Sequence, residues 1–66
     1  RAREAIQHFE RAIALDPRFA NAHFNLGIAL EELGEPQRAI EHYRRAVEID
    51  PAHRARARVA ALTRGP

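Results

Sequence analysis

The sequence of 66 residues contains no cysteine, and this single absence removes several classes of site. Disulfides, zinc-finger spacings and thiol chemistry are excluded, and the composition mildly favours a reducing compartment. We therefore expect a cytoplasmic location. Because a core of this size stabilises a fold only marginally, the chain needs regular helix packing or self-association in place of disulfides.

Long apolar runs and serine are absent as well. A membrane helix needs an apolar run of about 18 residues, and no such run and no signal peptide are visible, so we expect no membrane partner. There is no serine for a serine–histidine dyad and no glycine-rich phosphate loop. Glu31 and Glu32 are adjacent, so on a helix their carboxylates diverge by about 100°. We expect neither enzymatic activity nor a cofactor.

Lysine is missing too, and every basic residue other than histidine is arginine. The formal net charge is only +2, but the tail from residue 54 onward carries four arginines and no acidic residue. They are Arg54, Arg56, Arg58 and Arg64. On a helix they form no single stripe, and no aromatic side chain is interleaved for base stacking. Binding of nucleic acid or another anionic partner through this tail is the weakest alternative that we consider.

An internal repeat is the strongest positive signal. At an offset of 34 residues, the segments 5–9, 11–13 and 15–17 match the segments 39–43, 45–47 and 49–51, with conservative substitutions. Self-similarity at such a period is typical of a solenoid, in which each unit buries its apolar face against its neighbours. The chain is therefore predicted to be a stack of similar units.

The apolar residues within each matching segment recur at helical spacing, which predicts amphipathic helices. Asp16-Pro17 and Asp50-Pro51 are predicted to end two of them, and Gly34 to end a third in a left-handed conformation. The segment between the copies is more continuously apolar, so its helix is expected to be covered on more than one side. The prediction is an all-α fold with helices at 2–15, 20–33, 36–49 and 53–63, the last stopped by Gly65-Pro66.

The sequence resembles the tetratricopeptide repeat family, whose unit is 34 residues long. The resemblance rests on these residues: Asn25, Leu26, Gly27, Leu30, Gly34, Ala39, Tyr43, Ala46 and Pro51. It implies helix-turn-helix repeats of an α-solenoid, with a complete unit at 20–53 after a half repeat at 1–19. Residues 54–66 depart from the pattern, because Ala60-Ala61 stands for leucine-glycine, and are predicted to be a terminal or degenerate helix. His23 stands where the family usually has a large aromatic residue.

The resemblance implies a protein-interaction scaffold whose concave face holds an extended peptide segment. The residues that it places on this face are Ala22, Phe24, Asn25, Ile28, Glu31 and Glu32, and the predicted peptide-binding residues are the last five of these with Arg58. An amide such as that of Asn25 both donates to and accepts from a peptide backbone. Phe24 replaces the lysine of the family's carboxylate clamp, which argues against that specificity. The alternative for Phe24 and Ile28 is that they only pack against neighbouring helices.

A second hypothesis is self-association. Ile6, Phe9 and Ile13 lie on the first helix without a preceding partner helix, and an uncovered apolar face favours homo-oligomers. Metal binding is not expected, because His8 and His42 hold equivalent repeat positions about a helix diameter, or 10 Å, apart. Two ligands at that separation are too far apart to share an ion, given Zn–N bonds of about 2.0–2.1 Å.

Overall fold

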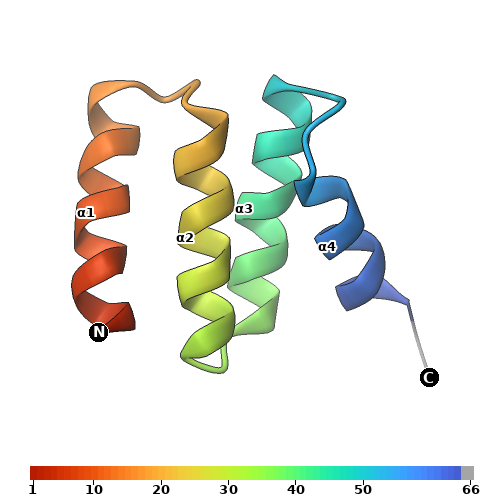
Figure 1. The fold of residues 1–66 in the computed structure, drawn as a ribbon, viewed down its shortest axis with the longest axis horizontal. Helices are drawn as coiled ribbons and strands as arrows, with labels where there is room; N and C mark the ends of the chain where they lie inside the picture. The colour runs from red at the N-terminus through yellow and green to blue at the C-terminus, as the bar shows by residue number, and fades with distance from the viewer. Residues whose placement is uncertain (65–66) are drawn as a thin grey trace.

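Four helices lie side by side in chain order in a computed structural model that describes residues 1–64 (Figure 1). They are α1 (Ala2–Leu15), α2 (Ala20–Glu32), α3 (Pro36–Ile49) and α4 (Ala55–Thr63). No strand occurs within these residues. The predicted all-α fold is confirmed, and the helix bounds differ from the predicted ones by two residues at most.

Local chemistry sets the ends of the first three helices. Asp16 and Asp50 each precede a proline, and their φ angles of −145° and −135° are extended where α1 and α3 end. Gly34 follows α2 with a φ of 76°, the left-handed conformation that the sequence predicts. The N–H of Glu35 then donates to the carbonyl of Leu30 at 2.9 Å, which is the long bond of a Schellman motif.

The contact between α2 and α3 forms the centre of the fold. Leu26, Leu30 and Tyr43 are the largest fully buried side chains. Gly27 makes the close approach possible, because a Cβ atom built there would overlap the Tyr43 ring. α2 packs against α1 as well as α3, which confirms that it is covered on more than one side.

α1 carries no fully buried residue. Ile6, Phe9 and Ile13 are half-buried and pack against the core cluster. The expectation of an uncovered face therefore needs correction, since α2 covers part of this apolar stripe. Ile6, Phe9 and Ile13 stay partly accessible to solvent.

α4 begins two residues later than predicted, at Ala55 instead of residue 53. The cause is the side chain of His53, whose Nδ1 accepts the backbone N–H of Ala55 at 3.0 Å. The preceding turn is closed by Asp50, whose carboxylate accepts the N–H of Ala52 at 3.1 Å. The predicted stop at Gly65-Pro66 lies outside the described residues. None of the helices within 1–64 combines the length and the apolar character needed to cross a membrane.

Candidate peptide-binding surface

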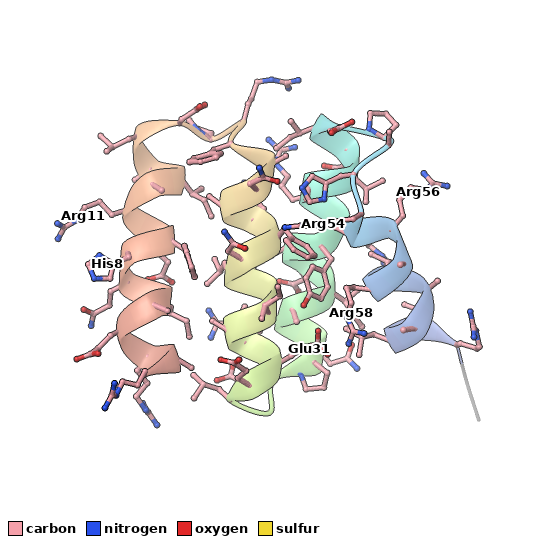
Figure 2. The ribbon with its side chains drawn as sticks, in the orientation of Figure 1. His8, Arg11, Glu31, Arg54, Arg56 and Arg58 are labelled. Carbon is pink, nitrogen blue, oxygen red and sulfur yellow. The ribbon has the colours of Figure 1, made fainter. Side chains whose placement is uncertain are left out.

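Five of the six predicted peptide-binding residues lie along α2, and the sixth, Arg58, reaches them from α4 (Figure 2). Their exposure differs widely. Phe24 is only 7% exposed, whereas Ile28 is 37% exposed. Asn25 is half-buried and Glu32 is exposed. The structure thus divides the predicted set into side chains that face solvent and side chains that support them.

Phe24 belongs to the supporting group. Its ring packs against the rings of Tyr43 and His53, with centroids 5.7 and 5.2 Å away. The guanidinium of Arg54 lies over the ring, 4.7 Å from its centroid, at a distance where a cation–π attraction operates. The expectation that Phe24 offers an apolar anchor to a ligand is therefore corrected, because α3, α4 and the turn between them already cover it.

Glu31 is the centre of a polar network that joins three helices. Its carboxylate accepts a hydrogen bond from the Tyr43 hydroxyl of α3 at 2.5 Å. It also accepts two from Arg58 of α4, at 3.2 Å from Nε and 2.6 Å from Nη2. This bidentate pair leaves the side chains 43% (Arg58) and 23% (Glu31) exposed. Such a geometry fixes the direction of both groups.

The network shifts the pKa of each member. Burial alone raises the pKa of Glu31, but the hydrogen bonds from Arg58 and Tyr43 and the charge of Arg58 outweigh it, so the pKa falls below 4.5. Burial, together with the hydrogen bond to the Glu31 carboxylate, raises the pKa of Tyr43 to about 12. The hydrogen bond to Glu31 raises the pKa of Arg58. The acid and the base both remain charged near neutral pH.

Asn25 and Ile28 are one turn apart on α2, so their side chains lie on the same face of the helix. The Asn25 residue is half-buried, but its side-chain amide reaches solvent and takes part in no side-chain hydrogen bond within residues 1–64. Ile28 is one of three large apolar side chains that are most exposed in the described chain, with Leu15 and Phe19. The α2 surface therefore combines a free amide with an accessible apolar side chain.

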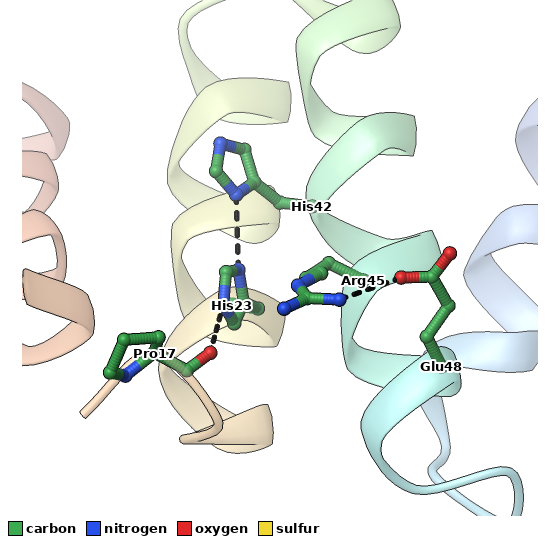
Figure 3. Close-up of polar contacts among 5 residues, drawn as sticks. All are labelled: Pro17, His23, His42, Arg45 and Glu48. Carbon is green, nitrogen blue, oxygen red and sulfur yellow. Dashed lines mark hydrogen bonds and ion pairs between the residues drawn. The ribbon is translucent and has the colours of Figure 1, made fainter.

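Two contacts of histidines were missed by the sequence reasoning. His53 is only 8% exposed, and its Nε2 lies 2.6 Å from the Oδ1 of Asn21 at the start of α2. His23 is only 6% exposed, and its Nδ1 lies 3.3 Å from the Nδ1 of His42 on α3 (Figure 3). The signal for the second contact was His23 at a position where the family usually has a large aromatic residue, in the most continuously apolar of the predicted helices.

His8 has no part in either contact, although it is equivalent to His42 in the repeat. In Figure 2, His8 and Arg11 both lie on the side of α1 that faces away from α2. Within residues 1–64 no group of three or more histidine, aspartate or glutamate side chains is placed to hold a metal ion. Among the histidines of residues 1–64, His23 and His42 are the two whose rings contact each other.

The arginines of α4 are not gathered into one basic patch. Arg58 is paired with Glu31, and Arg54 lies over Phe24. Arg56 points away from these two (Figure 2) and donates to the Pro51 carbonyl at 3.3 Å. A hollow of about 420 Å³ between α3 and α4 also lies apart from the α2 surface, with Val47 and Val59 among its lining residues.

Comparison with known families places these features in context. A model of the tetratricopeptide repeat matches residues 1–54, which contain α1, α2 and α3. A comparison with curated proteins finds no match. Repeats of the matched family are non-catalytic modules that generally mediate protein–protein interaction. Because the matched residues make up most of the sequence, the chain belongs to the tetratricopeptide repeat family.

Proposed function

We propose that this chain is a protein-interaction module that binds an extended peptide segment along α2. The contact residues are Asn25, Ile28 and Glu32, the members of the predicted set that are neither buried nor engaged in a side-chain hydrogen bond within residues 1–64. The observation that carries the proposal is the Asn25 amide, which takes part in no side-chain hydrogen bond within residues 1–64 and reaches solvent. Its donors and its acceptor are therefore available to a ligand backbone.

The chemistry of the surface suits a main-chain ligand. The amide of Asn25 carries two donors and an acceptor, which match the alternating N–H and C=O groups of an extended peptide. Ile28 adds apolar area one turn away. Glu32 supplies a carboxylate at the edge, which favours a peptide with a basic residue at the adjoining position.

Phe24, Glu31 and Arg58 support this surface without taking a direct part. Phe24 is held by aromatic packing, and Glu31 is held by the bidentate contact with Arg58. A surface whose neighbours are already fixed loses little conformational freedom on binding, and this raises affinity. The ion pair also leaves the Glu31 carboxylate with less capacity to contact a ligand.

Selection from a random peptide library tests the proposal. The chain is expected to capture peptides, and Asn25→Ala is expected to lose most of that capture. Gln37→Ala is the matched control, because it removes an exposed amide from α3 instead of α2. Equal capture by the wild type and Asn25→Ala contradicts the role of Asn25. Capture by no variant at all contradicts peptide binding itself.

Self-association is a second candidate function. α1 packs against α2, but Ile6, Phe9 and Ile13 remain only half-buried. Docking of a second copy on their accessible edges removes further apolar area from water, at about 25 cal/mol per Å². Light scattering over a dilution series is expected to show dimers that dissociate on dilution. A monomer at every concentration contradicts this candidate.

A further inference from the structure

His23 and His42 face each other across the contact between α2 and α3. Their Nδ1 atoms are 3.3 Å apart while the ring centroids are 5.5 Å apart, so the two nitrogens lie between the rings. The other ring nitrogen of His23, Nε2, lies 3.1 Å from the carbonyl oxygen of Pro17 in the turn before α2 (Figure 3). Both nitrogens of the buried His23 ring are therefore engaged.

These contacts determine where the protons are. A carbonyl oxygen only accepts, so the Nε2 of His23 carries hydrogen and donates to Pro17. In a neutral ring the Nδ1 of His23 is then an acceptor. The hydrogen between the rings must belong to His42, whose Nδ1 donates to His23. His42 thus adopts the Nδ1–H tautomer.

The same geometry limits how many protons the pair accepts. A first added proton fits on the Nε2 of His42, because the Nδ1–H of His42 still donates to His23. A second proton has only the Nδ1 of His23 left, where it meets another N–H and another positive ring at 3.3 Å. We propose that His23 and His42 form an acid-sensitive latch between α2 and α3, which holds with no or one added proton and opens with two.

The charges around His42 act in both directions. Burial lowers its pKa below the ordinary 6.5, and the neighbouring His23 of α2 and Arg38 of α3 lower it further. Glu41 of α3 and Glu10 of α1 oppose this but do not reverse it. Figure 3 shows Arg45 beside the pair, and its charge is matched by Glu48 at 3.0 Å. Among residues 1–64, no carboxylate forms a hydrogen bond with either ring.

The latch makes folding depend on pH. Below pH 6.5 the unfolded chain takes up a proton on His42 more readily than the folded chain does, because the folded-state pKa of His42 lies below that value. Stability is therefore full above pH 6.5 and declines as the pH falls below it. For each proton that the unfolded state binds in excess, the folding equilibrium constant falls tenfold per pH unit.

Urea unfolding of the full chain at a series of pH values between 7.5 and 5 tests the latch. The folding equilibrium constant of the wild type is expected to fall as the pH is lowered to 5, by up to about tenfold per pH unit. His42→Gln keeps an amide that donates to His23 but takes up no proton, so its loss is expected to be smaller. The matched control is His8→Gln, which removes the equivalent exposed histidine of α1 and is expected to follow the wild type. Equal pH dependence of the wild type and His42→Gln overturns the proposal.

A second measurement does not depend on stability. Nitrogen-15 NMR of the imidazole rings at pH 7.5 is expected to show His42 as the Nδ1–H tautomer and His23 as the Nε2–H tautomer. In His42→Gln the His23 signal is expected to keep its Nε2–H form, because the bond to the Pro17 carbonyl remains. An Nε2–H tautomer for His42 in the folded wild type overturns the latch, because the hydrogen between the rings is then missing.

Discussion

α1 and α4 flank the same hairpin of α2 and α3, but different interactions attach them. α1 keeps the repeat pattern and packs through half-buried apolar side chains. α4 departs from that pattern, and polar contacts add to the packing of Val59 and Leu62 at its junction. His53 reaches Asn21, and Arg58 pairs with Glu31. Only Ala55 of α4 is fully buried.

The difference shows that a helix without the repeat pattern is attached in part by side-chain hydrogen bonds and an ion pair. The strength of apolar packing depends little on salt or pH. An ion pair weakens as the salt concentration rises, and it is lost when a change of pH neutralises one of its partners. Ala61 illustrates the change at α4. It stands at the position where Gly27 of α2 admits the Tyr43 ring, so its Cβ disfavours a following helix that carries such a ring. These contrasts lead to four predictions.

His53→Ala is expected to have the largest effect, because His53 holds the junction between α3 and α4. It leaves the N–H of the buried Ala55 without its acceptor, at a cost of about 1–3 kcal/mol. Loss of the ring contact with Phe24 adds about 0.5–1.5 kcal/mol. Urea unfolding measures the sum. His8→Ala is the control, and an equal loss of stability in both variants contradicts the account of α4.

Phe9→Ala is expected to weaken the attachment of α1. The ring is half-buried, so the loss is about 1–2 kcal/mol, roughly half that of a fully buried ring. Because the contact is apolar, the loss is expected to be the same at low and at high salt. Gln7→Ala, an exposed change on the same helix, serves as the control. A strongly salt-dependent loss is incompatible with this description of α1.

Arg58→Met is expected to have a smaller effect that depends on salt. The substitution keeps much of the aliphatic stem but removes the charge that pairs with Glu31. Thermal unfolding at low salt is expected to show a lower Tm than the wild type, and the difference is expected to shrink at high salt. Arg56→Met is the control, because Arg56 donates to the Pro51 carbonyl and forms no ion pair within residues 1–64. Equal behaviour of the two variants contradicts the ion pair.

The smallest expected effect is that of Glu31→Gln on the stability of the fold at low pH. The folded-state pKa of Glu31 lies below its ordinary 4.5, so the carboxylate contributes stability above pH 4.5 that is lost as the pH falls through the lower folded value. Glu31→Gln is expected to flatten the dependence of unfolding free energy on pH in this range. Glu32→Gln, which changes the exposed neighbour, is expected to leave the dependence in place. Acid titrations followed by circular dichroism distinguish the two.

The sequence predicts the helices well because their ends depend on local chemistry. Gly34 and the two aspartate–proline pairs act within a few residues, and the stripe of α1 needs only helical spacing. Gly27, one of the residues on which the family resemblance rests, lies at a close contact between two helices. The helix ends and the stripe of α1 each depend on residues that lie close to them in the sequence.

The side-chain contacts between helices were harder to predict. His53 bonds to a residue 32 positions earlier, and its ring rotamer determines where α4 begins. Phe24 was assigned to a ligand surface because the sequence does not reveal that Arg54 covers its ring. The His23–His42 contact depends on the axial offset between α2 and α3 in their packed positions. Tertiary packing sets these geometries, and helical periodicity carries no information about them.

The most direct test of the proposed function is an NMR titration of the isotope-labelled chain with a peptide selected from a library. Binding along α2 predicts that the largest chemical-shift changes occur at Asn25, Ile28 and Glu32, with smaller changes on α1. Saturation of these changes at a fixed peptide ratio supports a single site. Changes centred instead on the hollow between α3 and α4, at Val47 and Val59, contradict the account.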